Sequence, residues 1–327
     1  MQLQKGFQWR KTWRHRNNFE ERAVIHFPYD TLPRLTSMKP DVIISAELGA
    51  RTLQAAIYRL FVQRTRLVVW ATLSEVTELD RGLLRRLLRR LLLRAADAVI
   101  VNGSSGARYV ARFGVPPSKV FRVPQTTDIQ PFLNLPIDRP AGSIIRLLYS
   151  GRLVELKGLV PFVSQLGTWA ALHPVSRLEM TLVGDGPLRN ALENVPRPSN
   201  LSLRFLGHVP YGELPGIYGQ ADILVFPSLA DEWGLVAVEA MAAGLPVLGS
   251  LYSQAVEDLV VDGKNGWSFR PDEEEEVRSA LDRALTTASA DFGAIRSQAR
   301  ETVRHLTPLK MAEDIGAALD YACTHRP

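Results

Sequence analysis

Cysteine is almost absent from this chain of 327 residues, which contains one, Cys323. A single cysteine excludes an internal disulfide and is typical of a reducing compartment. No stretch reaches the roughly 18 apolar residues of a membrane-spanning helix. The basic segment 1–19 has no apolar run of the kind found in a signal peptide. We therefore expect a cytoplasmic protein that is soluble or peripheral on the inner face of the membrane.

Two common phosphate-binding motifs are also missing. The sequence contains no G-x-x-x-x-G-K-[ST] loop, and no G-x-G-x-x-G follows a predicted strand. These motifs place backbone amides against phosphates in P-loop and dinucleotide-binding proteins. A nucleotide site in this chain therefore needs another construction.

Positive charge is concentrated in the first half. Residues 1–145 contain 23 Lys+Arg and 11 Asp+Glu, whereas residues 146–327 contain 16 and 23. A basic half followed by an acidic half predicts two domains with different partners. The basic half is suited to anionic lipid, nucleic acid or a phosphorylated substrate, and charge alone leaves these alternatives open.

Short β-rich runs alternate with helical patterns along the whole chain. The predicted strands are 40–47, 66–72, 97–103, 119–124, 144–151, 178–186, 201–209, 222–228 and 246–250. The predicted helices are 50–63, 81–96, 104–114, 159–172, 187–195, 211–221, 235–243 and the tail 292–325. This alternation predicts parallel strands joined by crossover helices, and hence an α/β fold.

Proline and glycine cluster in residues 134–143, which we interpret as a linker. The predicted domains are therefore residues 1–140 and 141–305, each Rossmann-like, followed by a helix at 306–327. In open parallel sheets, ligands bind beyond the carboxyl ends of the strands. The loops that follow the strands of the second domain should accordingly line one edge.

The first chemically informative loop reads "YSGRLVELKGL" (149–159). Gly151 allows a tight turn after the strand, and Arg152 and Lys157 place two cations near the start of a helix. Cations beside a helix start suit a diphosphate. The alternative is that both are solvated surface charges.

The second informative stretch is "PSLADEWGLVAVEAMAAGLPVLGS" (227–250). Asp231 lies in the loop, and Gly234 and Leu235 open a helix whose free amides attract phosphate. Glu239 follows about one turn later, and its carboxylate can accept two hydrogen bonds from a vicinal diol. The alternatives are a helix cap for Asp231 and an exposed helix residue for Glu239.

Several blocks occur here in the order of a known family. "SGRLVELKGL", "LVGDGPLR", "FLGHVPYGELPGIYGQADILVFPS", "DEWGLVAVEAMAAGLPVLGS" and "VEDLVVDGKNGWSF" resemble the motifs of glycosyltransferase family 4, retaining enzymes of the GT-B fold. The resemblance is close over residues 144–270 and looser over 40–132. It implies two Rossmann-like domains that face each other across a cleft. The N-terminal domain looks shortened, since residues 1–23 offer no apolar strand of the kind with which the family opens, and the first plausible strand is the weak 23–27.

The resemblance implies a role for each matching residue of the donor site. The donor-binding set is Gly151, Arg152, Lys157, Gly184, Val209, Gly234, Leu235 and Glu239. Arg152 and Lys157 would bind the diphosphate of a nucleotide sugar and stabilise it as it leaves. Glu239 would hold the ribose hydroxyls, and Asp231 would contact the transferred sugar. The backbone at Gly234 and Leu235 would meet phosphates and sugar, and that near Val209 would contact the base.

The implied activity is transfer of a sugar, with retention, to a hydroxyl of a glycan, a lipid-linked or a small-molecule acceptor. The family needs no divalent metal, and the chain has no D-x-D triplet or His/Cys cluster. We expect no cofactor and no nucleic-acid partner, and a C-terminal helix that crosses back to the first domain. Rival hypotheses are a catalytically weak nucleotide-sugar-binding protein and a sugar-nucleotide epimerase of the same fold.

In the first domain, Glu75 in "VVWATLSEVTE" (68–78) is a weak catalytic candidate, and a solvated loop residue is the alternative.

The run 81–94 of the same domain, "RGLLRRLLRRLLLR", predicts a helix with Leu84, Leu87, Leu88 and Leu91 on one face and arginines largely on the other. Its leucines would pack on the sheet, while a surface helix that touches anionic lipid is the other interpretation.

Overall fold

The computed structural model describes residues 6–15, 19–79, 82–138, 143–287 and 289–325. The chain divides into two compact units, one of Met1–Gln125 with Leu309–Pro327 and one of Thr126–Pro308. This division lies before the proline- and glycine-rich segment 134–143, in which the sequence predicted the domain boundary. Phe132, in the short helix α5 (Gln130–Leu133), packs into the core of the second unit, which explains the earlier boundary.

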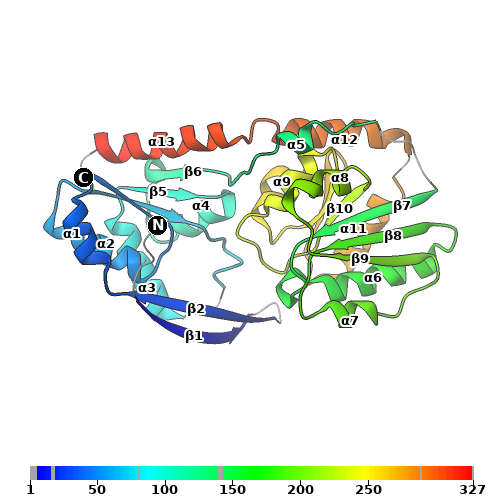
Figure 1. The fold of residues 1–327 in the computed structure, drawn as a ribbon, viewed down its shortest axis with the longest axis horizontal. Helices are drawn as coiled ribbons and strands as arrows, with labels where there is room; N and C mark the ends of the chain where they lie inside the picture. Colours follow the sequence, from blue (N-terminus) through cyan, green and yellow to red (C-terminus); the bar gives the residue numbers. More distant parts are fainter. Residues whose placement is uncertain (1–5, 16–18, 80–81, 139–142, 288, 326–327) are drawn as a thin grey trace. The chain divides into compact units, whose positions relative to one another are not determined.

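The first unit contains a four-stranded parallel sheet in the order β3-β4-β5-β6 (Figure 1). Its strands are β3 (Val42–Ser45), β4 (Arg66–Ala71), β5 (Ala98–Val101) and β6 (Val120–Arg122). Its helices are α1 (Thr31–Met38), α2 (Ala50–Phe61), α3 (Leu83–Ala95), α4 (Ser104–Ala111) and the 3-10 turn η1 (Pro117–Lys119). β5 is buried along its whole length because its apolar residues lie between neighbouring strands and helices.

A separate antiparallel hairpin opens the first unit. β1 (Gly6–Arg14) pairs with β2 (Glu20–Pro28) over nine residues each. The expectation that the first strand is 23–27 was therefore wrong, although β1 is not the apolar strand with which the family opens. β1 was missed because it alternates aromatic with cationic and polar residues and has no apolar run. Phe7 and Trp9, two residues apart on one face, are both exposed.

The second unit contains a six-stranded parallel sheet in the order β12-β11-β10-β7-β8-β9. Its strands are β7 (Ile144–Ser150), β8 (Arg177–Val183), β9 (Leu201–Gly207), β10 (Ile223–Phe226), β11 (Val247–Ser250) and β12 (Gly266–Phe269). Successive residues of β7 belong to different core clusters, Leu147 to one and Leu148 to the other. Helices therefore cover both faces of the sheet, as a doubly wound fold requires.

The helices of the second unit connect these strands. They are α6 (Leu159–Leu172), α7 (Arg189–Glu193), α8 (Leu214–Tyr218), α9 (Leu235–Ala242), α10 (Gln254–Leu259), α11 (Glu274–Leu285) and α12 (Ser289–Val303), with the 3-10 turns η2 (Glu155–Lys157) and η3 (Tyr211–Glu213). α6 and α11 contribute to the core cluster that contains Leu147, and α8 and α9 to the one that contains Leu148.

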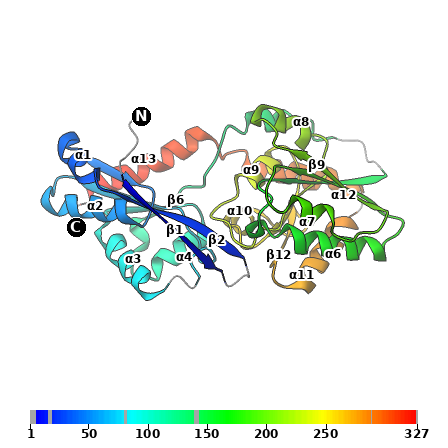
Figure 2. The ribbon, with the colours of Figure 1, turned by 60° about the horizontal axis from the view of Figure 1, so that its bottom comes forward.

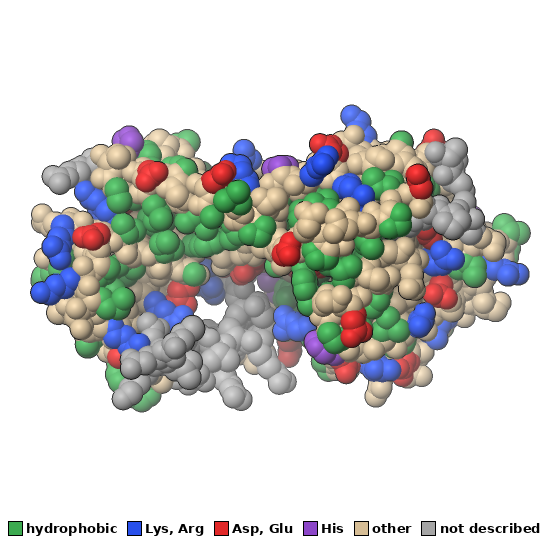
Figure 3. All heavy atoms as spheres, turned by 45° about the horizontal axis from the view of Figure 1, so that its top comes forward, with side chains coloured by type: hydrophobic (Ala, Val, Ile, Leu, Met, Phe, Trp, Pro, Cys, Tyr) green, Lys and Arg blue, Asp and Glu red, His purple; other side chains and the backbone are tan. Residues whose placement is uncertain are grey.

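The predicted helical tail is two helices with a break between them. α12 ends at Val303, and α13 (Pro308–Thr324) begins at a proline, which is favoured at a first helical position because it lacks an N–H. Ala318 and Ala322 of α13 are fully buried in a core cluster with residues of the first unit. On the face shown in Figure 3, hydrophobic side chains gather on the first unit beside α13. The C-terminal helix is thus part of the first unit.

The leucine-rich helix α3 is oriented differently from the prediction. Leu84, Leu87 and Leu91 are exposed rather than packed on the sheet, whereas Arg89 is 3% exposed. Arg89 turns inward because Glu78, whose side chain is 5% exposed, needs a cation beside it. The apolar contact of α3 with the core comes from Leu92 and Leu93 and from the partly buried Leu88, the one predicted leucine that does pack inward.

Candidate active site

The strand order of the second unit defines a topological switch point. β7 is the first strand of the sheet in sequence and has β8 on one side and β10 on the other. Loops that follow β7 and β10 meet at the carboxyl edge of such adjacent strands, where open α/β sheets bind ligands. The backbone N–H of Leu229 in the β10 loop donates to the carbonyl of Leu156 in the β7 loop, at 2.9 Å. The two loops that the sequence singled out are therefore in direct contact.

The loop after β8 reaches the same place through Gly184. This glycine has φ +119°, and a Cβ built on it would lie 2.0 Å from the carbonyl oxygen of Gly151. No side chain fits at that distance, so glycine is required for the loops after β7 and β8 to touch. The structure thus gives Gly184 a packing role that needs no ligand.

Lys157 and Asp231 are joined at the switch point. Lys157 Nζ lies 2.5 Å from Asp231 Oδ2, and the two side chains are 17% and 16% exposed. The Lys157 ammonium also lies 5.5 Å from the centre of the Phe226 ring. The interpretation of Lys157 as a solvated surface charge is therefore wrong. Arg152, in contrast, is exposed and forms no ion pair with any described residue.

Of the two neighbouring acids, only Asp231 is shown paired with Lys157. Its Oδ1 accepts a hydrogen bond from the backbone N–H of Trp233 at 3.3 Å. Glu232 has an exposed side chain, and its backbone carbonyl accepts from Gln254. Since α9 begins at Leu235 with Gly234 as its N-cap, Asp231 is not the helix cap.

Gly234 brings the start of α9 against the β10 strand. Its φ is +112°, and a Cβ at this position would lie 2.7 Å from Phe226 Cε1 and 2.9 Å from Ser253 Oγ. The first backbone N–H groups of α9 have no partner within the helix and carry its positive dipole end. Gly234 and Leu235 therefore present backbone donors close to the Lys157–Asp231 pair.

Glu239 lies inside the second unit and is only 6% exposed. The hydroxyl of Tyr218, which is fully buried, donates to Glu239 Oε2 at 3.2 Å. Burial raises the pKa of the Glu239 carboxyl, and hydrogen bonds from Tyr218 and Tyr211 offset part of that rise. The interpretation of Glu239 as an exposed helix residue is therefore wrong.

The two tyrosines were missed by the sequence analysis. Tyr211 and Tyr218 are seven residues apart in "PYGELPGIYGQ"; Tyr211 begins the 3-10 turn η3 and Tyr218 ends the short α8. Their spacing of two helical turns was the available signal. Tyr211 also contacts Thr127 Oγ1 at 3.2 Å, and desolvation raises its pKa.

Val209, the predicted base contact, lies after β9 and is partly buried. It packs with Leu235 against the core cluster that contains Tyr218. The remaining candidate, Glu75, belongs to the first unit and ion-pairs with Arg108, at 2.7 Å, and with Arg112. Its side chain is 18% exposed, so it is not a solvated loop residue. Its catalytic role stays a prediction.

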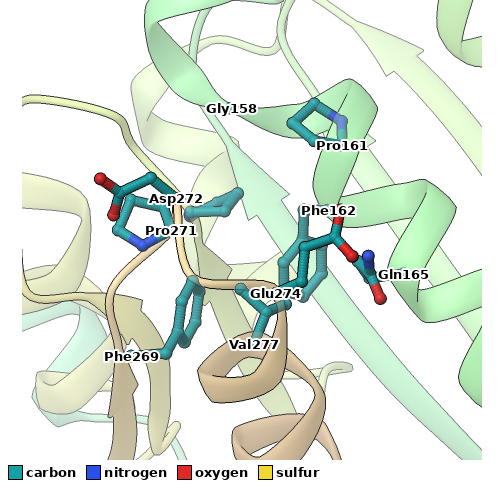
Figure 4. A pocket seen from close by; sticks show the side chains of 10 residues that line it. Gly158, Pro161, Phe162, Gln165, Phe269, Pro271, Asp272, Glu274 and Val277 are labelled. Atoms are coloured by element: carbon teal, nitrogen blue, oxygen red, sulfur yellow. The ribbon is translucent and has the colours of Figure 1, made fainter. Parts of the chain in front are cut away.

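A cavity of about 230 Å³ lies on another side of the β7 loop (Figure 4). Phe162 of α6 and Phe269 of β12 line it, with ring centroids 6.0 Å apart. Asp272 and Glu274 also line it, and their charge does not suit a diphosphate. Lys157, Asp231 and Glu239 do not line this cavity.

Within the described ranges, no three His, Cys, Asp or Glu side chains come together as a metal ion would require. In the same part of the chain, no helix is long and apolar enough to span a bilayer.

Comparison with known proteins adds the family context. Residues 145–287 match the family model described as "Glycosyl transferases group 1". Glycogen synthase of Mycobacterium tuberculosis is 32% identical over 171 residues, which cover 52% of this chain and 40% of that protein. 2-Deoxystreptamine N-acetyl-D-glucosaminyltransferase of Streptomyces fradiae is 30% identical over 255 residues, covering 73% of this chain and 56% of the relative. The chain spans about half the length of these curated relatives.

Solved structures agree on the fold. The crystal structure of HepE from Anabaena in complex with UDP has a TM-score of 0.69 at 20% identity, covering 88% of this chain and 81% of that one. The predicted fold class, an α/β fold with parallel sheets like those of GT-B glycosyltransferases, is confirmed. The similarity to group 1 glycosyltransferases is supported most directly over the second unit.

Proposed function

We propose that this protein is a retaining, metal-independent glycosyltransferase that moves a sugar from a nucleoside-diphosphate donor to a hydroxyl acceptor. The observation that carries the proposal is the meeting of Lys157, Asp231 and the start of α9 at one switch point, with Glu239 in the same helix. The match of residues 145–287 to the group 1 family model supports it.

The diphosphate of the donor binds between the cations and the helix start. Arg152 and Lys157 supply positive charge, and the backbone amides at Gly234 and Leu235 supply donors. Negative charge accumulates on the diphosphate as its bond to the sugar breaks, and preorganised donors stabilise that charge. In the free protein the Lys157–Asp231 ion pair keeps both side chains ordered. The sugar, next to the diphosphate, then lies beside Asp231.

The ribose of the donor binds Glu239. One carboxylate oxygen, Oε2, already accepts from Tyr218, which orients the group. The remaining lone pairs accept from the two ribose hydroxyls. UDP is bound by the structurally similar HepE, so a uridine nucleotide is the first donor base to test. A glycan, lipid-linked or small-molecule acceptor and a cytoplasmic location remain predictions.

A thermal-shift screen against nucleotide sugars tests the binding part. A donor that binds only the folded state raises the free energy of unfolding, by about 2.7 kcal/mol at a concentration 100 times its Kd. The melting temperature rises accordingly. We expect stabilisation by one or a few nucleotide sugars in the presence of EDTA. No stabilisation by any of them, with or without Mg²⁺, would contradict the proposal.

A transfer assay tests the reaction itself. The donor identified by the screen is incubated with pooled acceptors, and the anomeric configuration of the product is read by NMR. We expect retention and no loss of rate with EDTA. Tight donor binding without turnover would favour the binding-protein hypothesis, and conversion of the donor sugar without transfer would favour the epimerase.

A further inference from the structure

The helix α3 exposes a row of leucines on the first unit. Leu84, Leu87 and Leu91 are 84%, 67% and 58% exposed. Spacings of three and four residues put them on one line along the helix. Figure 2 shows α3 at the rim of its unit. Exposed apolar rows of this kind mark interaction surfaces on soluble units.

A row of cations runs beside the leucines. Arg86, Arg90 and Arg94 recur every four residues, all are exposed, and none forms an ion pair with any residue that the structure describes. α3 contains no acidic residue. The exposed side of α3 is therefore amphipathic, because its row of leucines lies beside a row of arginines.

Buried contacts of α3 fix which side of the helix faces solvent. Arg89 pairs with Glu78 and donates to the Tyr109 hydroxyl, while Leu92 and Leu93 fill the core. Turning the exposed leucines inward would expose those two leucines and move both Arg89 and Arg85 away from the buried Glu78 carboxylate. Breaking a buried pair in this way is strongly unfavourable. The outward leucine row is thus a stable feature of the fold.

We propose that α3 docks the first unit on an anionic lipid bilayer. Leu84, Leu87 and Leu91 enter the boundary between headgroups and acyl chains, and the flanking arginines extend to lipid phosphates. The charge of the whole unit favours this occupant, since it carries 24 Lys+Arg and 12 Asp+Glu. The leaflet attracts such a surface at long range, because its potential is negative. This inference stands on the first unit and does not depend on the proposed sugar transfer.

A second copy of the chain is a poorer occupant of the same surface. A twofold dimer places the same patch on both partners. Two α3 helices would then face each other with three exposed arginines each and no acid in either helix. Like charges at that distance oppose association, whereas an acidic leaflet supplies the missing negative charge.

Flotation with vesicles tests the proposal on the full chain. Vesicles of phosphatidylglycerol and phosphatidylcholine in equal parts should bind the protein, and vesicles of phosphatidylcholine alone should bind it much less. The triple variant Leu84→Gln, Leu87→Gln, Leu91→Gln should lose roughly tenfold or more of its partitioning. The double variant Arg86→Gln, Arg90→Gln should lose roughly 20-fold and most of its salt dependence.

Matched controls use exposed leucines elsewhere. Leu172 on α6 and Leu309 on α13 are 69% and 72% exposed, so Leu172→Gln, Leu309→Gln should bind acidic vesicles like the parent. Circular dichroism confirms that every variant is folded. Failure of the parent protein to bind acidic vesicles at low salt overturns the proposal, and so does unchanged binding by the leucine variant. A dimer that the leucine substitutions dissociate would assign the surface to a second copy and overturn it too.

Discussion

The two units share parallel α/β architecture but differ in surface. The first carries 24 Lys+Arg and 12 Asp+Glu, and the second 15 and 22. Of 18 large apolar side chains exposed in the described parts of the chain, 13 belong to the first unit. The second unit buries most of its apolar residues, whereas the first exposes more of them together with positive charge. One architecture thus carries two different surfaces, a polar sheet edge in the second unit and an amphipathic helix in the first.

The two units also differ in how a helix of each, α3 in the first and α9 in the second, buries an ionisable side chain. Arg89 of α3 has a carboxylate beside it, so its charge is compensated within the fold. Glu239 of α9 has two tyrosine hydroxyls and no cation among its described contacts, and burial raises its pKa. A compensated buried charge holds a structure together, while an uncompensated one is a mark of a functional site.

The largest expected effect concerns the compensated charge. Arg89→Leu removes the buried cation beside Glu78 and leaves this carboxylate only the half-exposed Arg85, 3.5 Å away, so it should lower the free energy of unfolding by roughly 3–5 kcal/mol at most. Urea denaturation followed by circular dichroism measures this loss. Arg90→Leu, one residue away and exposed, is the control and should change stability little. Equal effects of the two substitutions would show that the Arg89–Glu78 pair is not structural.

Next in size is the loss of the cation at the switch point. Lys157→Ala should reduce the transfer rate by about 10²–10³-fold, the range found for a lost donor to developing negative charge. Single-turnover kinetics with the donor identified by the screen measures it. Lys264, an exposed lysine of the same unit, serves as control, and Lys264→Ala should leave the rate unchanged. A rate for Lys157→Ala within twofold of the parent would remove Lys157 from the site.

Glu239→Gln should separate donor binding from stability. Hydrogen bonds to a charged group contribute about 1.5–3 kcal/mol, so donor affinity should fall by roughly 10–100-fold. A carboxyl whose pKa is raised on folding costs stability as pH rises through that pKa, so the amide should match or exceed the parent in stability at neutral pH. Calorimetry and thermal unfolding measure the two effects, and unchanged affinity refutes the ribose assignment.

The same pKa shift predicts a pH dependence of binding. The carboxylate form of Glu239 accepts the ribose hydroxyls, so donor affinity should be full above its pKa and fall as pH drops through it. Because burial raises this pKa above 4.5, the loss should begin at a higher pH than for an ordinary glutamate. Titration calorimetry across acidic pH checks the direction, and Glu239→Gln should abolish this pH dependence.

The smallest effect is expected from the residue that orients Glu239. Tyr218→Phe removes one hydrogen bond, worth about 0.5–1.5 kcal/mol, and should weaken donor binding by roughly 2–10-fold. That hydrogen bond lowers the pKa of Glu239, so its loss should also move the acid limb of donor binding to higher pH. A merely structural role for Tyr218 would lower stability without moving that limb.

Sequence reasoning recovered much of the fold and missed identifiable parts. Most strands and helices of the second unit follow from apolar runs between glycine-rich loops, and β7 and α6 fall where predicted, but β12 and α10 were not predicted. β1 escaped because pairing with β2 stabilises a strand that has no apolar run of its own. The loops that carry Lys157 and Asp231 were found from their cations and acids. Tyr218 was not, because its partner Glu239 is 21 residues away and only folding joins them.

By itself the sequence determined the alternation of strands and helices, the glycine loops and the charge of each half, because these depend on local composition and spacing. Tertiary structure alone decided which side of each helix is buried. Leu84, Leu87 and Leu91 of α3 face outward although periodicity favoured inward packing, and burial of Glu239 excludes the alternative of an exposed helix residue. The physical reason is common to both: a buried polar partner, Glu78 for Arg89 and Tyr218 for Glu239, comes from a distant part of the chain and sets the orientation.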